Sequence, residues 1–517
     1  MPPRTPPTGC RSADHPRLAR RGLIQVGALG LLGAGLADLL RLEAEAATRL
    51  PKKPGRARGV IFIFQAGGPS QFETWDPKPD APSEIRGEYA PISTRVEGLR
   101  ICEHLPRLAQ RAHRYSILRT LHHPAGPALR NEHNSAQYLL QSGTHDLPPG
   151  DTTSTIHLPR SRPFEWPSIA SLLAYTAPAG TGLPPAISIP RGGGDGPGQR
   201  SGMLGTRYTP WGLILAAPCR APDPAGSCPR CFSHDQPDDP ERAPGKGPKA
   251  WWDNSSCRDA SFRLPDLGTP TGVTLSRLDQ RRALLEHVDQ CRRDLDGEHG
   301  VRDVDVYRRQ AMELILSQRG RSNPFDLSQE SDRVRDRYGR EEWGQGFLLA
   351  RRLIEAGARM VQVNLRGWDT HQNAFRDLKG KLLPSLDHCL SGLLDDLEER
   401  GLLDEVLVVM CGEMGRTPVI SPISPGGLNA AGVPFTPGRH HWGDVFPCFF
   451  AGGGIRPGQV VGRTDATGGY PDGEAYTPAD LAATIFHLMG VGPDEEFHDP
   501  EGRPYRIYQG EPIRALL

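Results

Sequence analysis

This chain of 517 residues lacks an excess of charge of either sign, because 61 Lys and Arg residues balance 61 Asp and Glu residues. Lysine itself is scarce, with 7 of the 61 cations, so arginine carries most of the positive charge. The balance excludes a chain-wide electrostatic surface for nucleic acid or anionic membrane. The sequence also has no internal repeat at a solenoid period, which excludes propellers and helical arrays.

Glycine and proline are abundant instead. The 60 Gly and 51 Pro residues make up about a fifth of the chain, well above the usual share but below that of low-complexity sequences. This composition predicts a loop-rich globular protein. The length is sufficient for one large α/β domain or for two to three ordinary ones.

The N-terminus has the pattern of an export signal. Arg20 and Arg21 precede a weakly apolar stretch from Leu23 to Leu40, as is typical of a twin-arginine signal, which exports folded proteins. The alternative is an uncleaved tether, although a stretch of about 18 residues with an internal Asp makes a poor span. We therefore expect a signal peptide over 1–47, a linker over 48–58, and a periplasmic or secreted protein that meets the membrane only through an uncleaved signal segment.

A stretch from about 191 to 270 has little periodicity and is expected to be an insertion in the main domain, 59–517. It carries a cysteine cluster at Cys219, Cys228, Cys231 and Cys257. Four thiolates with one C-x-x-C pair suit a structural zinc ion. Two disulfides are equally compatible with an oxidising compartment, free thiols are a further alternative, and a redox module is a weaker one.

Apolar runs alternate with helical patterns along the rest of the chain. This order predicts an α/β three-layer sandwich, with a mainly parallel central sheet and helices on both faces. A long helix from Phe375 to Leu397 is expected to kink or restart at Pro384. The other expected helices are 128–141, 274–296, 301–318 and 478–489, and the expected strands are 60–64, 115–118, 186–189, 360–365, 406–410 and 448–451.

Metal-ligating residue types follow or precede three of these strands. They are Asp369 and His371 after the strand at 360–365, Glu413 after 406–410, and His440 and His441 before 448–451. In such sheets reactive groups gather beyond the carboxyl ends of the strands. Carboxylate and imidazole ligands suit Zn²⁺ or Mn²⁺. The pattern predicts a site for a divalent metal ion, Zn or Mn first, with Ca or Mg as alternatives.

Five motifs in order carry a resemblance to a known family: G-G-P-S at 67–70, W-D-T-H-Q-N at 368–373, G-E-M-G-R-T-P at 412–418, G-R-H-H-W at 438–442 and A-G-G-G-x-x-x-G at 451–458. The sequence resembles the domain-of-unknown-function 1501 family of exported bacterial proteins, over roughly 59–515 without the cysteine-bearing stretch. That family belongs to the alkaline phosphatase-like superfamily, and its own activity is not established.

The resemblance implies that Asp369, His371 and His441 hold one metal ion. It makes His440 a supporting or alternative ligand, because relatives often carry Asp there. The superfamily's second metal lacks its usual residues, since the first strand ends in Gln65 without a carboxylate, and Glu413 is followed by Met instead of His. Only loop geometry would let Gln65, Glu73 or Asp76 compensate, so one bound metal is expected.

The superfamily nucleophile is expected ten residues before a helix-closing glycine, here Gly143, and that position holds His133. Ser135 is the nearest hydroxyl, but two residues along a helix turn it about 200° away. His133 is therefore a candidate nucleophile, general base or further ligand.

Together these features suggest an exported metal-dependent hydrolase of small-molecule or glycan sulfate or phosphate esters, with no nucleic-acid partner. Arg416 is expected to bind the tetraoxo anion bidentately. Glu413 would support the ligand shell or bind weakly. The alternative is a catalytically degraded, metal-stabilised binding or scaffold protein of the cell envelope.

Overall fold

The computed structural model describes residues 57–152, 156, 164–177, 183–189, 196–213, 277, 280, 323–421 and 436–517. The chain divides into two units, Met1–Pro54 and Gly55–Leu517, and all described residues belong to the second. Several predicted features lie outside the described residues. They are the signal peptide, nearly all of the linker, the four clustered cysteines, most of the insertion, and all but two residues of the helices predicted at 274–296 and 301–318.

An eight-stranded sheet forms the centre, in the order β12-β4-β11-β8-β1-β7-β5-β6. β11 is antiparallel to both of its neighbours, and the other pairs are parallel. The prediction of a mainly parallel sheet is therefore confirmed. The strands are β1 Gly59–Gln65, β4 Tyr115–Leu121, β5 Ala186–Ile189, β6 Trp211–Gly212, β7 Met360–Leu365, β8 Val406–Cys411, β11 Phe446–Ala451 and β12 Val460–Val461.

The apolar run of β1 is continuous because both faces of the sheet are covered. Phe62 and Phe64 belong to one hydrophobic core, whereas Ile61 and Ile63 belong to the other. Successive side chains of a strand point to opposite faces, so a strand that is buried twice needs apolar residues at every position.

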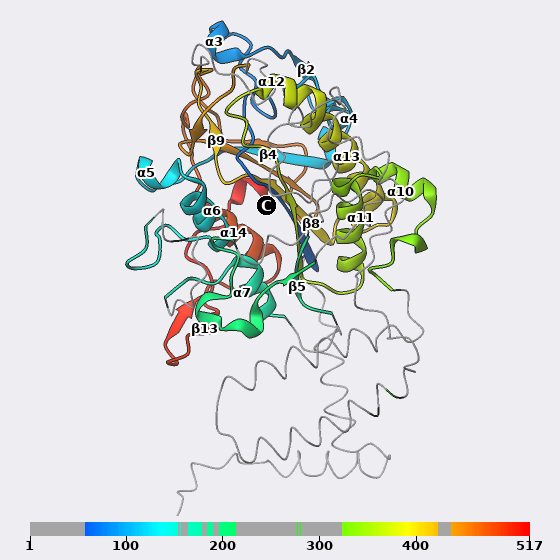
Figure 1. The fold of residues 1–517 in the computed structure, drawn as a ribbon, viewed down its shortest axis with the longest axis vertical. Helices are drawn as coiled ribbons and strands as arrows, with labels where there is room; N and C mark the ends of the chain where they lie inside the picture. Colours follow the sequence, from blue (N-terminus) through cyan, green and yellow to red (C-terminus); the bar gives the residue numbers. More distant parts are fainter. Residues whose placement is uncertain are drawn as a thin grey trace, which may run out of the picture. The chain divides into compact units, whose positions relative to one another are not determined.

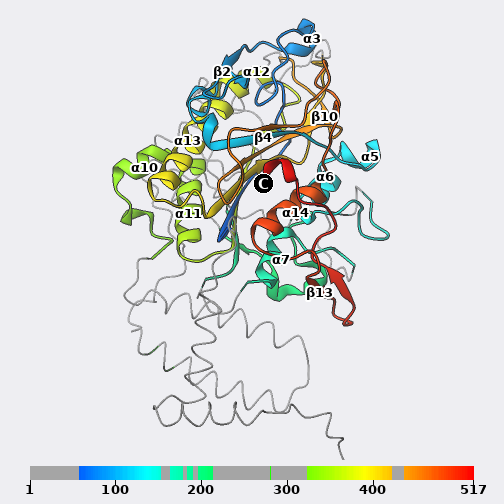
Figure 2. The ribbon, with the colours of Figure 1, turned by 180° about the vertical axis from the view of Figure 1, so that it is seen from behind.

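Helices cover each face, which confirms the three-layer architecture (Figures 1 and 2). One layer packs around the core that includes Ile61, and the other around the core that includes Phe62. The first holds α4 Pro106–Ala109, α10 Asp332–Tyr338, α11 Glu342–Glu355, α12 Ala374–Asp377 and α13 Leu383–Glu399, and the second holds α6 His133–Ser142, α7 Ile169–Tyr175 and α14 Pro478–Leu488.

Two predicted helices are subdivided. The pattern at 128–141 gives α5, Pro127–Arg130, and a separate α6, because the Glu132 carboxylate accepts a hydrogen bond from the Ser135 amide at 3.1 Å and caps a new helix there. The long helix restarts near Pro384 as predicted, with a π-helical turn at Leu378–Leu382 between α12 and α13.

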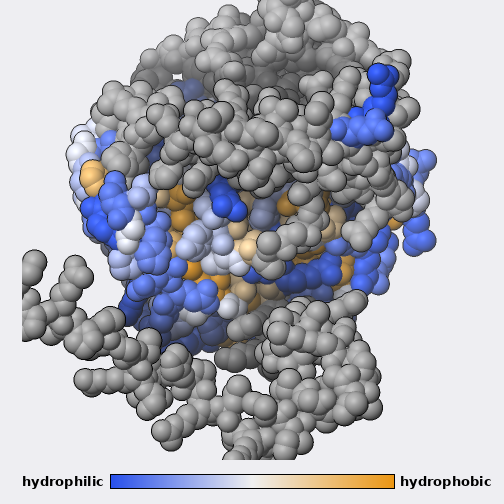
Figure 3. Space-filling model, turned by 90° about the horizontal axis from the view of Figure 1, so that it is seen from below, coloured by the Kyte–Doolittle hydropathy of each residue, from blue (hydrophilic) through white to orange (hydrophobic). Residues whose placement is uncertain are grey.

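The predicted start of α14 is confirmed in detail. Thr477 and Asp480 form a reciprocal capping box, and Pro478 occupies the first turn. None of the helices among the described residues is long and apolar enough to cross a bilayer. Seen from below, apolar residues gather toward the middle of the described surface and hydrophilic residues toward its margin (Figure 3).

Short elements complete the described fold. The ribbon of β9, Gly415–Arg416, and β10, His441–Trp442, matters for the site because it pairs His441 with Arg416. Since β11 runs antiparallel, its start lies at the edge where the parallel strands end. The remaining α-helix is α3 Ser83–Arg86, and the remaining strands are β2 Pro91–Ser93 with β3 Arg100–Cys102 and β13 Glu496–His498 with β14 Pro504–Arg506.

Candidate metal centre

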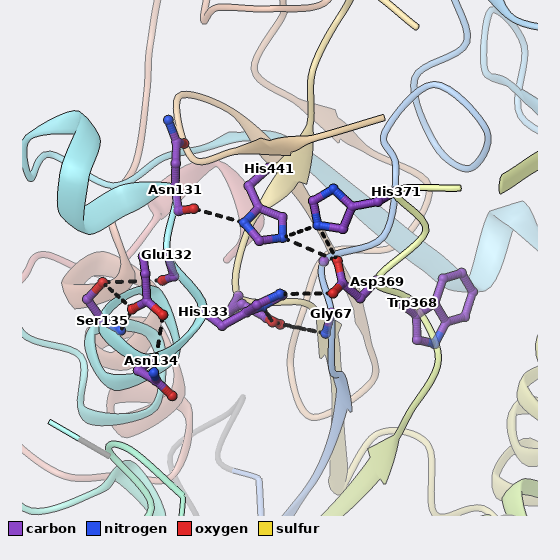
Figure 4. A network of polar contacts seen from close by, with 12 residues as sticks. Gly67, Asn131, Glu132, His133, Asn134, Ser135, Trp368, Asp369, His371 and His441 are labelled. Carbon is purple, nitrogen blue, oxygen red and sulfur yellow. Dashed lines mark hydrogen bonds and ion pairs between the residues drawn. The ribbon is translucent and has the colours of Figure 1, made fainter. Parts of the chain in front are cut away.

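Four side chains that are distant in sequence meet at this edge of the sheet (Figure 4). His133 is the first residue of α6, Asp369 and His371 lie in the loop after β7, and His441 lies in β10. Each offers one ligand atom, and these atoms all lie within 4.8 Å of one another. It is the one such group of His, Cys, Asp and Glu among the described residues.

The Asp369 carboxylate is the centre of the group. Its Oδ1 lies 3.0 Å from His371 Nε2 and 3.2 Å from His441 Nε2, and its Oδ2 lies 3.2 Å from His133 Nε2. The Nε2 atoms of His371 and His441 are 2.8 Å apart. All three imidazoles thus direct the same nitrogen toward one carboxylate.

The opposite ring nitrogens are held from outside. His133 Nδ1 lies 2.7 Å from Glu413 Oε1, and His441 Nδ1 lies 2.9 Å from the Asn131 carbonyl oxygen. Carbonyl oxygens and ionised carboxylates only accept hydrogen bonds, so both Nδ1 atoms carry the proton. His371 Nδ1 lies 2.9 Å from His440 Nδ1. His440 therefore lies behind a candidate ligand, which agrees with the supporting role among its two predicted roles.

This donor set fits a divalent cation. With Nδ1 protonated, a neutral His133 or His441 presents an Nε2 lone pair toward Asp369, and two such lone pairs facing a carboxylate repel unless a proton or a metal ion lies between them. Metal-binding histidines characteristically donate the other ring N–H to a carboxylate or a carbonyl. Three imidazole nitrogens and one carboxylate suit Zn²⁺ or Mn²⁺.

The metal-free electrostatics reflect the same crowding. Burial lowers the pKa of His133, but hydrogen bonds to the Asp369 and Glu413 carboxylates outweigh it and raise the pKa to about 10. Burial raises the pKa of Asp369, yet hydrogen bonds from the three histidines and the charge of Arg416 hold it well below its usual range. Asp369 is therefore ionised and available as a ligand.

Glu413 lies behind the group instead of within it. Its carboxylate accepts the His133 Nδ1–H and the Gly67 amide, the latter at 2.9 Å. His123 Nε2 lies 2.6 Å from the Glu413 carbonyl oxygen, and burial lowers the pKa of His123 to about 4, so a neutral ring donates this bond. Of its two predicted roles, the geometry favours support of the ligand shell.

Two glycines allow the loops to approach so closely. A Cβ at Gly67, which has φ of 114°, would lie 2.2 Å from the Asp369 amide nitrogen. A Cβ at Gly438 would lie 2.3 Å from the His371 carbonyl oxygen. The glycines of the G-G-P-S and G-R-H-H-W motifs are thus required by backbone contact with the two ligands of the loop after β7.

Arg416 differs from the prediction that it binds the substrate anion. The side chain is fully buried, and its guanidinium donates to the carbonyls of Gly67, Gly68, Trp368 and Arg439 and, at 2.6 Å, to Asp369 Oδ1. The convergence of three loop backbones supplies these acceptors and excludes a ligand from the fork. Arg416 instead orients the central carboxylate and joins the loops that carry the site.

None of the three residues considered as compensating ligands belongs to the group of four, and two of them have other partners. Glu73 pairs with the buried Arg439 at 2.7 Å, and Asp76 pairs with Arg119 and Lys78 at 3.2 Å. Gln65 is buried outside the group of four, with its Nε2 atom unpartnered.

The predicted orientation of Ser135 is found in the structure. Its hydroxyl is buried and donates to the Leu129 carbonyl at 2.5 Å, away from the group.

Two functional contacts were missed from the sequence. Asn131 supports His441 through its backbone carbonyl and accepts the Gly443 amide on its side chain at 2.6 Å. His123 supports Glu413. A carbonyl has no sequence signal, but the adjacent residues His122 and His123 directly follow β4 at the same sheet edge, and that position could have suggested the second contact.

A model of the family described as "Protein of unknown function (DUF1501)" matches residues 57–517. No curated protein matches the sequence significantly. Among solved structures, alkaline phosphatase from the Antarctic bacterium TAB5 is similar at 10% identity and a TM-score of 0.34, over 84% of this chain and 99% of that one. The sulfatase PsFucS1 from Pseudoalteromonas sp. is similar at 13% identity and 0.31, over 89% and 72%. The phosphonate monoester hydrolase SpPMH from Silicibacter pomeroyi is similar at 12% identity and 0.31, over 88% and 76%.

Proposed function

Given that this chain belongs to the DUF1501 family, we propose that it is an exported, metal-dependent hydrolase of phosphate or sulfate esters. The observation that carries the proposal is the convergence of His133, His371 and His441 on Asp369 at one edge of the sheet. Their outer ring nitrogens are supported as in metal sites, which surface histidine pairs do not require.

The site would serve an anionic ester because of its charge. Asp369, Glu413 and Arg416 together carry one negative charge and lie in direct contact with the ligand group or within it. A divalent ion therefore leaves the centre with an excess of one positive charge, which favours a phosphate or sulfate group. The Asp369 side chain is 45% exposed and that of His371 35% exposed, so solvent and substrate reach the group.

The residues of the group and the two side chains that support it each have a defined part in the proposed reaction. Asp369, His371 and His441 would hold the ion, which would supply Lewis acidity and the activation of water at neutral pH, and His133 would act beside it as nucleophile or general base. Glu413 keeps the proton on His133 Nδ1, so that Nε2 is the atom presented to the centre. Arg416 fixes Asp369 Oδ1 through a bond of 2.6 Å and prevents the carboxylate from rotating away.

A second candidate is a binding or scaffold protein of the cell envelope that keeps the metal for stability. One observation favours it: the group already offers four protein ligands, which is the closed shell of a structural zinc site, whereas catalytic zinc sites keep one position open. His133 decides between the two, because it completes the shell only if it binds the ion.

Metal analysis combined with an ester screen tests the proposal. We expect one equivalent of a divalent metal in the purified protein and in a control variant at the exposed His487, His487→Ala, and none in His371→Ala. Turnover of 4-nitrophenyl phosphate or 4-nitrophenyl sulfate should be lost together with the metal. A metal-loaded protein that hydrolyses neither ester supports the scaffold, and a metal-free wild type overturns both candidates.

His133→Ala separates the roles of this histidine. A variant that keeps the metal but loses turnover makes His133 the nucleophile or base, and one that loses the metal makes it a ligand.

Export through the twin-arginine route is part of the proposal and has its own test. Replacing Arg20 and Arg21 with lysine should retain the protein in the cytoplasm, whereas an unchanged distribution between cell fractions would contradict this route.

A further inference from the structure

Two buried cysteines face each other across neighbouring strands of the central sheet. Cys411 is the last residue of β8, and Cys448 lies in β11. These strands are antiparallel, and Phe449 lies opposite Met410. Because the partners in an antiparallel pair move in opposite directions along the two strands, the next position of this register places Cys448 directly opposite Cys411.

Both thiols lie on the same face of the sheet. Cys411 and Cys448 belong to the hydrophobic core that includes Phe62, whereas their neighbours Met410 and Phe449 belong to the other core. This alternation of faces agrees with the register. Each cysteine is at most 1% exposed and carries a free thiol. Burial and the neighbouring Cys411 thiol raise the pKa of the Cys448 thiol, so the two thiols interact.

The spacing of opposite residues meets the requirement of a disulfide. In an antiparallel pair, the Cα atoms of directly opposite residues are about 4.5 to 5.5 Å apart. Disulfides join residues whose Cα atoms are about 4.4 to 6.8 Å apart. The two strands therefore need neither separate nor change register for a bond to form between Cys411 and Cys448, and the sheet accommodates it as it stands.

The two cysteines stand at the ends of a segment that carries part of the candidate metal centre. Glu413 follows Cys411 by two residues, and His441 precedes Cys448 by seven. The segment 412–447 thus leaves the sheet at one cysteine, brings Glu413 and His441 to the group around Asp369, and returns to the sheet beside the other cysteine. A bond between its ends would close this segment into a ring and reduce the number of conformations open to it in the unfolded chain.

We propose that Cys411 and Cys448 are a modification site, at which a disulfide forms in an oxidising compartment and fixes the segment 412–447 at its base. The co-reactant is a disulfide compound, such as oxidised glutathione or the disulfide of an oxidoreductase. One cysteine thiolate attacks this donor and displaces a thiolate, and the other cysteine then attacks the mixed disulfide and displaces the second thiolate. The two cysteines lose two electrons and two protons, and the donor is reduced to two thiols.

Burial makes the exchange depend on local opening of the sheet edge. A buried thiol forms little thiolate, so the pair reacts only when the end of β8 or β11 opens. The chain can therefore fold with both thiols reduced, and the bond forms afterwards, where reducing agents no longer maintain thiols. Once the bond has formed, the same burial protects it from reduction.

Peptide mapping of the purified protein after incubation with oxidised glutathione tests the site. Trypsin should release Cys411 in the peptide 401–416 and Cys448 in the peptide 440–463, and neither peptide contains another cysteine. After the remaining thiols are alkylated, these two peptides should be linked in wild type and in Cys389→Ala, which removes a buried thiol from the other core. The link should be absent in Cys411→Ala. Urea below the unfolding transition should speed its formation, because exchange requires opening.

Thermal melting tests whether the bond fixes the segment. Oxidised wild type should melt about 3 to 8 °C above the reduced protein, Cys389→Ala should keep this increment, and Cys448→Ala should lack it. Peptides that stay unlinked after prolonged oxidation in urea overturn the proposal, and a link without an increment in the melting temperature overturns the fixing of the segment. If the alanine variants do not fold, the peptide map of wild type alone upholds or overturns the bond. None of these readouts depends on ester turnover, so the proposal stands or falls separately from the hydrolase.

Discussion

Gly67→Ala tests whether contact between loop backbones sets the geometry of the metal group. A methyl group at residue 67 would lie 2.2 Å from the Asp369 amide nitrogen, 2.7 Å from the Trp368 carbonyl carbon and 2.9 Å from Asp369 Cα. Real Cβ atoms essentially never approach closer than 3.0 Å. The loop after β7 must therefore move by at least about 0.8 Å, the difference between 2.2 and 3.0 Å, and Asp369 moves with it.

The expected effect on metal binding follows from this displacement. Metal–ligand distances tolerate about 0.2 Å, so a shift of this size costs the centre its carboxylate or distorts it. The Gly67 amide that holds Glu413 at 2.9 Å is disturbed as well, and loss of such an outer contact alone costs about 10- to 100-fold in metal affinity. We expect the affinity for Zn²⁺, measured by calorimetry, to fall by at least about 100-fold.

Gly98→Ala is the matched control. Gly98 also has positive φ, 79°, but a Cβ there meets nothing within 4 Å. Both variants bear the cost of a positive φ, about 1–2 kcal/mol of folding free energy, and only Gly67→Ala adds the collision. Wild-type Zn²⁺ affinity in Gly67→Ala, or an equal loss in Gly98→Ala, would refute the reasoning.

Three further predictions concern single side chains. Glu413→Gln should weaken Zn²⁺ binding about 10- to 100-fold, because the carboxylate that accepts the His133 Nδ1–H loses its charge. Calorimetry measures the affinity, with Glu88→Gln at an exposed position as the control. Unchanged affinity would show that Glu413 does not support the centre. Ser135→Ala should leave the metal content and any ester turnover unchanged, because the Ser135 hydroxyl bonds only to backbone carbonyls and to Glu132. Its free energy of unfolding should fall by about 1 kcal/mol. Abolished turnover in a folded, metal-loaded variant would instead identify Ser135 as the nucleophile. Burial lowers the pKa of Lys381 to about 6, below its unfolded value of about 10.4, so between these values the unfolded state binds more protons and stability rises with pH by up to about 1.4 kcal/mol per unit. Because His133, with its raised pKa, contributes with the opposite sign in this range, the test is the difference: between pH 6.5 and 8.5, urea unfolding should give a slope of stability against pH that is more positive in wild type than in Lys381→Met, and equal slopes would contradict the prediction.

The ligand set shows how far strand patterns lead. Asp369, His371 and His441 were predicted together because each adjoins a recognisable strand, and parallel strands end at one edge of the sheet. His133 was identified by its spacing from Gly143, with a ligand as one of three roles, and the structure brings it into the same group. The antiparallel direction of β11 explains why a residue that precedes a strand reaches the same edge.

Strand patterns did not predict the orientation of Glu413 and Arg416. Both occupy the motif after β8, and the sequence cannot indicate whether a polar side chain points into the site or supports it from behind. That orientation depends on which backbones lie beside each side chain. Arg416 is surrounded by carbonyls of three loops, those of Gly67 and Gly68, of Trp368 and of Arg439. Glu413 faces His133, and the Gly67 amide holds its carboxylate there.

By itself the sequence determined the layered α/β architecture and the edge at which metal-binding residues gather, because apolar periodicity and strand order are local properties of the chain. Tertiary structure alone decided that His133 joins the group around Asp369 and that Arg416 is interior. These features depend on distances of a few ångströms between segments far apart in sequence, and such distances arise only when loops pack against one another.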